Sequence, residues 1–549
     1  MGDGIRGRLS PRLDTTGSVL ATLFFCLSLT PSLLPRSWLL QGVIAGVLAA
    51  TGYLVGVVAA ALVRRLFHRS RSPVRRRLLR RVAVALGVVL CLVSVHFGAQ
   101  AQREIYALMG MTPPERLGYL NVPLVAAAVF AVLLVLARLL RRVSLALARL
   151  LSLWISPAIA RLAAAAGVAV LSVSLLNGIL TETLLEGADA SFKTLNGETS
   201  PGTSSPRAAT LSGSPSSLVS WASLGLEGRD FVAGGPTEAE LLGFSGLPPE
   251  RPIRVYVGLD AASSVRERAA LAVRELERTG AFDRRVLCVI TTTGTGWVDP
   301  RPADALEFMY NGDTALVSIQ YSYLPSWLSF LVDRERARVA GRELFNQVHD
   351  HWSRLPAGAR PALLVFGESL GVFGGEAAFS GDDDLRNRTD GALFVGPPNS
   401  SALWGEFVRG RDPGTPEVLP VYRRGETVRF ANRTEDMAAP SWPWPFPRVV
   451  YLQHPSDPIV WWSPDLVLGR PDWLREPRGE DVLPDIDWYP FVTFWQLTAD
   501  MVFSLDAPAG HGHDYGGEVA AAWARIAPPS GWDDSRTRAL VPIVESRTG

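Results

Sequence analysis

The chain has 549 residues, which is too long for a single compact domain. Its hydrophobic fraction of 48% and its positive mean hydropathy of +0.16 point towards a membrane protein. The net charge of +1 conceals an uneven division, because residues 1–185 hold 20 arginines and five acidic residues while the remainder holds 34 basic and 48 acidic ones. Three cysteines, two in apolar runs and one in a predicted strand, argue against a disulfide framework, a metal cluster and redox chemistry.

Several stretches of the first 185 residues are long and apolar enough to cross a bilayer. Four of them are Leu39–Val63, Val82–Phe97, Leu120–Leu136 and Leu162–Leu180, and a fifth, Gly17–Leu34, precedes them. The arginines before Gly17–Leu34 resemble the head of a signal peptide. This stretch lacks a small-residue cleavage site before its prolines, so we expect it to be retained as the first of about five transmembrane helices. No charged residue lies in the middle of a span, which disfavours a transporter.

Positive charge gathers on one side of the predicted spans. Nine arginines fall within residues 64–81, and four more follow Leu120–Leu136, whereas residues 99–118 hold two arginines and two glutamates. The positive-inside rule then places the N-terminus in the cytoplasm and everything after Leu180 outside, in a multi-pass protein of the cell membrane. Nucleic-acid or headgroup binding is the alternative for the arginines. They lack aromatic interleaving and a basic domain, so we expect no nucleic-acid partner.

Residues 187–217 are rich in Ser, Gly, Pro and Thr, which predicts a flexible tether. The chain then divides into a transmembrane domain (1–185), a linker (186–217) and a catalytic domain (218–549). Strand patterns lie at 252–259, 285–291, 315–321, 361–368, 392–395 and 449–452, and helix patterns at 263–279, 333–355, 372–379 and 518–526. This alternation predicts an α/β domain with a doubly wound, mostly parallel sheet.

The strand at 361–368 ends in a G-x-S-x-G pentapeptide that runs from Gly367 to Gly371 and is centred on Ser369. In such a pattern, a buried strand delivers a nucleophilic serine into a sharp turn before a helix, with glycines where the backbone is crowded. The pentapeptide alone is a weak signal, because a chance match is expected about a third of the time at this length and glycine content. An ordinary serine in a strand-to-helix turn is the alternative.

Two downstream segments supply partners for this serine. Asp457 follows the strand at 449–452, and His511 and His513 precede the helix at 518–526. The order serine, acid, histidine is that of the α/β-hydrolase fold, in which the histidine takes the serine proton and the carboxylate fixes the imidazole. Only one of the two histidines can be the base. Residues 491–505 before them are helical in pattern, unlike the strand that normally delivers this histidine.

Other parts of the expected site are less sharply defined. Glu435 and Asp436 remain alternatives for the acid. For the oxyanion hole we expect the N–H of Leu370 and a second donor from the loop 292–297, at Gly294 or Thr295. This loop lacks the Lys-Ser/Thr of a phosphate-binding loop, and we expect neither a cofactor nor a metal.

Tryptophan is dense in residues 441–495, which predicts an insertion over the site. Its aromatic residues would line an acyl pocket, rest on the membrane interface or belong to the core.

Four segments together resemble a family of actinobacterial integral-membrane α/β-hydrolases, with a multi-span N-terminal domain and a C-terminal catalytic domain. They are residues 28–36 (SLTPSLLPR), 293–297 (TGTGW), 320–327 (QYSYLPSW) and 367–371 (GESLG). The resemblance implies a serine hydrolase but no particular substrate. We expect cleavage of an ester or related acyl bond in a small-molecule, lipid or cell-envelope substrate. Acyl transfer by the same triad, or a catalytically silent domain that binds or organises the envelope, are the alternatives.

Overall fold

The computed structural model describes residues 13–66, 73–113, 115–178, 192–332 and 334–547. The chain forms two compact units: a helical unit of residues 1–175, 464–475 and 482–503, and an α/β unit of residues 176–463, 476–481 and 504–549. Three expected features fall partly outside the described residues: the arginine-rich loop at 67–72, the fourth predicted span at 179–180 and the predicted linker at 186–191.

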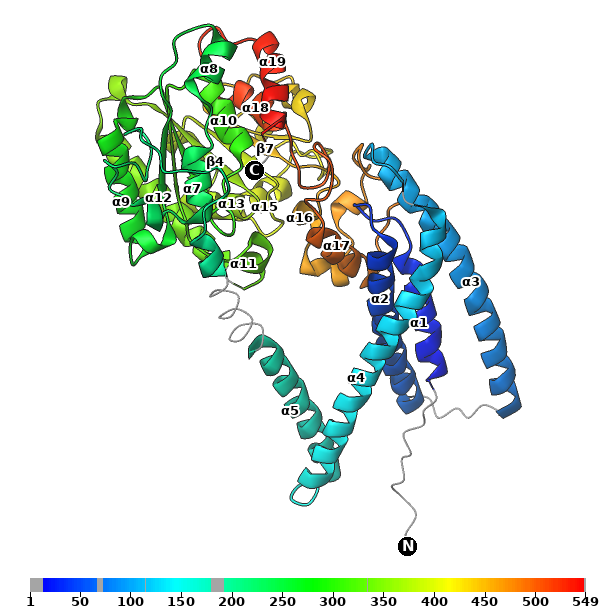
Figure 1. The fold of residues 1–549 in the computed structure, drawn as a ribbon. Coiled ribbons are helices and arrows are strands. Elements are labelled where there is room, and N and C mark those ends of the chain that lie inside the picture. The colour runs from blue at the N-terminus through cyan, green and yellow to red at the C-terminus, as the bar shows by residue number, and fades with distance from the viewer. Residues whose placement is uncertain (1–12, 67–72, 114, 179–191, 333, 548–549) are drawn as a thin grey trace. The chain divides into compact units, whose positions relative to one another are not determined.

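The helical unit begins with five helices (Figure 1). They are α1 (Thr15–Ser28), α2 (Trp38–Leu66), α3 (Pro73–Leu108), α4 (Val122–Leu151) and α5 (Pro157–Gly178). Helices α2 to α5 each contain a stretch long and apolar enough to cross a membrane. Helix α1 has only 14 residues, which is about 21 Å at 1.5 Å per residue and shorter than a hydrocarbon core of about 30 Å. The expected span Gly17–Leu34 is therefore too long, because the chain leaves the helix after Ser28, ahead of Pro31 and Pro35.

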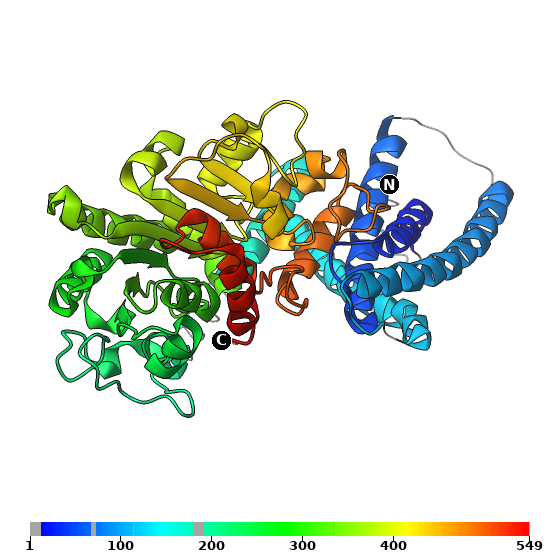
Figure 2. The same ribbon diagram turned by 90° about the horizontal axis from the view of Figure 1, so that it is seen from above.

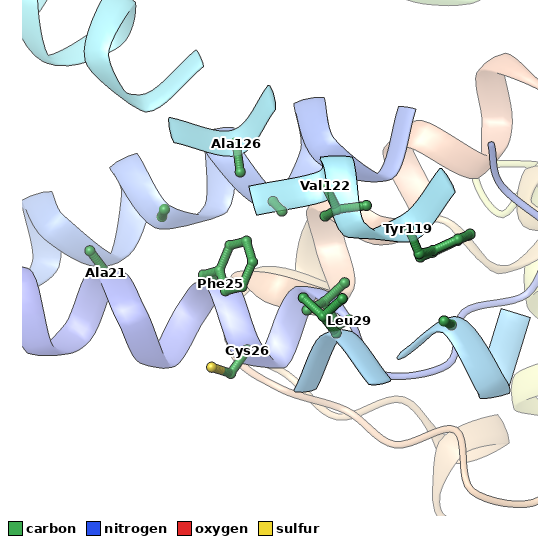
Figure 3. Packing of buried hydrophobic residues seen from close by; sticks show 11 residues of the cluster. Ala21, Phe25, Cys26, Leu29, Tyr119, Val122 and Ala126 are labelled. Atoms are coloured by element: carbon green, nitrogen blue, oxygen red, sulfur yellow. The ribbon is translucent and has the colours of Figure 1, made fainter. Parts of the chain in front are cut away.

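Helices α1, α2 and α4 pack closely because small residues face one another. Figure 3 shows the resulting apolar cluster, in which Phe25 of α1 lies near Val122 and Ala126 of α4. A methyl group on Gly52 of α2 would lie 2.5 Å from a carbonyl oxygen of α1, and one on Gly46 would lie 2.6 Å from a side chain of α4. Close approach at small residues is the usual way in which membrane helices associate.

The α/β unit is built on a seven-stranded sheet in which every neighbouring pair is parallel. Its order is β1-β3-β2-β4-β5-β7-β6. The strands are β1 (Ile253–Val257), β2 (Val286–Thr291), β3 (Thr314–Ile319), β4 (Ala362–Glu368), β5 (Gly391–Val395), β6 (Val428–Ala431) and β7 (Arg448–Leu452). The strands are almost continuously buried, as in sheets that are covered on both faces. The predicted α/β fold class and parallel sheet are confirmed.

Helices cover the sheet on both sides (Figures 1 and 2). Helices α9 and α12 pack together on one face, and α10, α18 and α19 pack together on the other. The helices of this unit are α7 (Gly225–Ala233), α8 (Glu238–Ser245), α9 (Val265–Thr279), α10 (Pro300–Met309), α11 (Ser326–Val332), α12 (Arg334–Arg354), α13 (Leu370–Gly375), α14 (Asp382–Arg388), α15 (Ala402–Arg409), α16 (Pro458–Trp461), α18 (Glu518–Ile526) and α19 (Asp534–Glu545).

The described part of the predicted linker, residues 192–217, is not a free tether. Leu211 pairs with Arg254 of β1, and the Ser217 hydroxyl donates to the buried carboxylate of Glu275. Farther upstream, Ser200 donates to Asp230. The serines that suggested a solvated linker therefore satisfy carboxylates of the α/β unit.

The C-terminal half is not one continuous domain either. Residues 464–475 and 482–503 belong to the helical unit, where α17 (Val492–Val502) packs against α1 and α2. The helix expected before the histidines is thus present, but it does not lie in the α/β unit.

Candidate active site

Ser369 lies in a strained turn between β4 and α13. Its backbone has φ 53° and ψ −123°, a conformation that non-glycine residues rarely adopt. A methyl group on Gly367 would lie 2.5 Å from the carbonyl oxygen of Gly371, and one on Gly371 would lie 2.4 Å from that of Thr291. The Ser369 N–H donates to the carbonyl of Val395 at the end of β5 (2.8 Å). Both glycines are therefore needed, and the half-buried serine is held at the carboxyl end of the sheet.

Asp457 follows β7 and receives three hydrogen bonds. One carboxylate oxygen accepts from the N–H of Ile459 (2.9 Å), and the other accepts from His513 Nδ1 (2.6 Å) and from the Tyr515 hydroxyl (2.8 Å). The carboxylate is fully buried, and the His513 side chain is 6% exposed. This arrangement fixes the tautomer of His513, because Nδ1 must bear the proton that it donates.

The other ring nitrogen of His513, Nε2, is buried and has no hydrogen-bond partner among the described residues. The ring lies directly against Gly396, where a methyl group would be 2.4 Å from Cε1. Gly396 follows Val395, whose carbonyl accepts from the Ser369 backbone. An unpaired imidazole nitrogen is thus held beside the strand end that also holds the serine.

The structure brings Asp457 together with His513 and not with His511. The nearest carboxylate to His511 is that of Asp481, with 3.7 Å between Nδ1 and Oδ2. His511 is also more exposed, at 25% of its side chain. Glu435 and Asp436, the alternative acids, lie in a turn after β6, where Asp436 accepts from backbone N–H groups of Asn432 and Arg433.

The expected oxyanion donors have different surroundings. The N–H of Leu370, the first residue of α13, makes no hydrogen bond within the described part of the chain. The N–H of Gly294 donates to the Tyr321 hydroxyl (2.9 Å) and is already used. The Thr295 hydroxyl donates to Glu227 (2.9 Å), but its N–H makes no hydrogen bond within the described ranges. At the end of β2, Thr291 pairs with Gly367 in the sheet, and its carbonyl oxygen would lie 2.4 Å from a methyl group on Gly371.

Charged side chains connect the segments around the serine. Arg301, at the start of α10, binds Asp299 (3.0 Å) and Asp514 (2.5 Å), and Asp514 directly follows His513. Glu368, next to Ser369, hydrogen-bonds to Asp299. Burial, and then the negative charge of Asp299, raise the pKa of Glu368 well above its usual value. Burial also raises the pKa of Asp299, and the Arg301 guanidinium, whose Nε binds both carboxylate oxygens, opposes this shift.

Sequence reasoning missed the roles of Tyr515, Arg301 and Asp514, which support the site. Tyr515 holds Asp457 and stacks on His454 at 4.1 Å between ring centres. His454 is buried, which lowers its pKa, and its Nδ1 bonds the carbonyl of Gly512 (3.0 Å). Tyr515 lies two residues after His513, but an isolated tyrosine has no recognisable spacing. Arg301 and Asp514 are 213 residues apart in sequence, so nothing local could indicate their pairing.

The predicted Trp-rich insertion is divided between the core and the surface. Trp461 and Trp473 are buried, whereas Trp442 and Trp495 are exposed. In the part of the chain that the structure describes, no group of three or more His, Cys, Asp or Glu side chains is arranged to hold a metal ion.

Comparison with known families agrees with this architecture. Residues 253–540 match the family described as "Alpha/beta-hydrolase family", and residues 29–236 match "Alpha/beta-hydrolase family N-terminus". No curated protein and no solved structure matches the chain. The first match spans more than half of the chain and includes all seven strands together with Ser369, Asp457 and His513. The chain therefore belongs to the alpha/beta-hydrolase family, and its N-terminal part to the associated N-terminal family.

Proposed function

We propose that the chain is a membrane-anchored serine hydrolase that cleaves an ester or related acyl bond, with Ser369 as nucleophile, His513 as base and Asp457 as the acid. The observation that supports this best is the buried Asp457–His513 pair (2.6 Å), which leaves only Nε2 of the imidazole free to accept a proton. A strained serine on the neighbouring strand end completes the set. His511 has no place in this proposal.

In the proposed reaction, the Ser369 oxygen attacks the acyl carbonyl while its proton passes to His513 Nε2. The N–H of Leu370 stabilises the developing oxyanion, together with a donor from the backbone that follows β2. The intermediate then expels the alcohol, which takes the proton from His513 and leaves an acyl group on Ser369. Water, deprotonated by His513, hydrolyses this ester and restores the serine.

We further propose that the catalytic half lies outside the cytoplasm. Arg36, between α1 and α2, forms an ion pair with Asp500 of α17 (2.7 Å), so the α1–α2 connection and the segment 482–503 share one side of the membrane. The described residues beyond 192 contain no helix long and apolar enough to cross back. Arg64 and Arg65 lie at the opposite end of α2, and arginine-rich ends are retained in the cytoplasm.

A fluorophosphonate probe tests the catalytic proposal. The full-length protein in detergent or lipid nanodiscs should be labelled, and Ser369→Ala should abolish labelling. His513→Ala should slow it by about 10³-fold or more. His511→Ala, a matched removal of an imidazole two residues away, should leave the rate close to that of the wild type.

The other outcomes of this experiment have clear meanings. A wild-type protein that is folded but not labelled would refute the proposed hydrolase activity and favour a domain that only binds its ligand. Equal loss of labelling in the two histidine variants would refute the assignment of the base. If labelling shows an active serine, the products of ester cleavage by the unlabelled enzyme in the presence of an added alcohol separate hydrolysis from acyl transfer. The alcohol then competes with water for the acyl group on Ser369.

A further inference from the structure

Helix α17 is unusual in that its charged residue points inwards while several large apolar residues at and near its C-terminal half point outwards. Asp500, the one charged residue of Val492–Val502, is buried. Trp495, Val502 and the next residue, Phe503, have exposed fractions of 37%, 73% and 37%. A helix that faces water has the opposite arrangement. This polarity is expected where the surrounding medium is apolar.

The polar groups on the inner side are fully engaged within the helical unit. Asp500 accepts from Arg36 Nε (2.7 Å), from the Ser32 hydroxyl and from the N–H of Leu33 (3.3 Å). The side-chain amide of Gln496 donates to the backbone carbonyl of Thr30 (3.1 Å), and the backbone carbonyl of Gln496 accepts from the Arg36 guanidinium (2.7 Å). Ionisable groups at membrane depth require such partners, because water is not available to solvate them.

The depth at which this segment packs points to the same medium. Val492 lies in one apolar cluster with Phe24 of α1 and with Ile44 and Leu48 of α2. Helix α2 has 29 residues, so it is about 43 Å long at 1.5 Å per residue. A hydrocarbon core of about 30 Å centred on this helix would include both Ile44 and Leu48. The start of α17 therefore packs against residues that lie below the membrane surface.

We propose that α17 is embedded in the bilayer leaflet on the catalytic side, with Trp495, Val502 and Phe503 in contact with lipid acyl chains. The residues that flank the segment 482–503 bond the loops of the proposed site. Asp481 accepts from Ser456, next to Asp457, and the Ser504 carbonyl accepts from the N–H of His513 (3.1 Å). Resting on the proposed function, this arrangement identifies the substrate class as an amphiphilic lipid ester of the same leaflet. The segment that supplies the base emerges from the layer that holds such esters.

A spin label at Val502→Cys in the full chain tests the location without requiring catalysis. In vesicles, collisions with dissolved oxygen should exceed collisions with a water-soluble nickel chelate. The same label at Leu247→Cys, which is 60% exposed in the α/β unit, should show the reverse. The protein without an introduced cysteine measures the labelling of the native thiols. A nickel-accessible Val502 label would overturn the proposal, and so would one shielded from both reagents, because protein or a second copy would then cover this face.

The substrate class has a separate test. Val502→Asp should lower the ratio of hydrolysis of a long-chain ester in vesicles to that of soluble p-nitrophenyl acetate by about tenfold or more, because a carboxylate is costly within lipid. Val502→Ala, which is smaller but apolar, should change this ratio much less. An unchanged ratio in Val502→Asp would refute the lipid ester as substrate. Absence of all hydrolysis in the wild type would instead refute the proposed function, and the spin-label result would still stand.

Discussion

Removing one partner of the buried ion pair between Arg36 and Asp500 should destabilise the helical unit more than removing one partner of an exposed pair. Both side chains are at most 1% exposed, and the guanidinium also binds the Ser32 hydroxyl (2.6 Å) and the Gln496 carbonyl (2.7 Å). Asp500→Asn keeps the size of the side chain but removes its charge, so the buried guanidinium loses its counterion. Removing one partner of a buried pair costs about 3–5 kcal/mol.

For a unit of this size, that loss corresponds to a fall in melting temperature of roughly 6–20 °C. The assay is thermal unfolding of the full chain in nanodiscs. Arg64→Gln is the matched control, because Arg64 forms an ion pair with Asp14 in the same unit (3.2 Å) but is 59% exposed. Loss of such a surface pair should cost less than about 1 kcal/mol.

The double variant Arg36→Met/Asp500→Leu distinguishes loss of a counterion from loss of packing. With both charges gone, no buried charge is left unpaired, and most of the stability should return. A melting temperature of Asp500→Asn equal to that of Arg64→Gln would show that the buried guanidinium does not need its counterion. A double variant less stable than Asp500→Asn would show that the hydrogen bonds, rather than the charge balance, hold the segment.

Two further predictions concern the α/β unit. Because the folded protein raises the pKa of Glu368, the stability that depends on its proton is complete below the unfolded pKa of about 4.3 and is lost as the pH rises through the folded pKa. Its deprotonation adds charge beside Asp299, so fluorophosphonate labelling of the wild type should fall as the pH rises through the folded pKa of Glu368, and Glu368→Gln should remove this fall. Identical pH profiles of the two proteins would contradict a protonated Glu368 in the folded protein. Gly396→Ala should slow labelling of Ser369 by about 10²-fold, measured per folded molecule, because the new methyl group would lie 2.4 Å from His513 Cε1 and displace the imidazole. Normal labelling kinetics would show that the ring can relax.

The sheet could be predicted from sequence because its strands are continuous apolar runs bounded by turn residues. Strand β6 escaped because it has only four residues, and with Arg429 among them just three apolar residues remain, too few to form a recognisable pattern. In the fold this arginine is buried and donates to the carbonyls of Gly425 and Met437, so its charge is solvated by the backbone.

The choice between the two histidines could not be made from sequence. His511 and His513 lie in the same glycine-containing loop, and only the three-dimensional position of Asp457, more than 50 residues upstream, distinguishes them. The assignment of α17 to the helical unit was beyond reach for the same reason, since Asp500 and its partner Arg36 are 464 residues apart. Long-range polar pairs leave no periodic pattern, whereas strands and helices do.

The three members of the proposed triad depend on different supports, and this has a physical consequence. Ser369 is fixed by the ends of β4 and β5, within a buried parallel sheet. Asp457 and His513 are fixed by loops that hydrogen-bond to Asp481 and Ser504, the residues of the α/β unit that flank residues 482–503 in sequence. Disorder in residues 482–503 would therefore loosen Asp457 and His513 through these loops before it loosened Ser369. The strained turn is a property of the sheet, whereas the orientation of the imidazole depends on the segment that the helical unit holds.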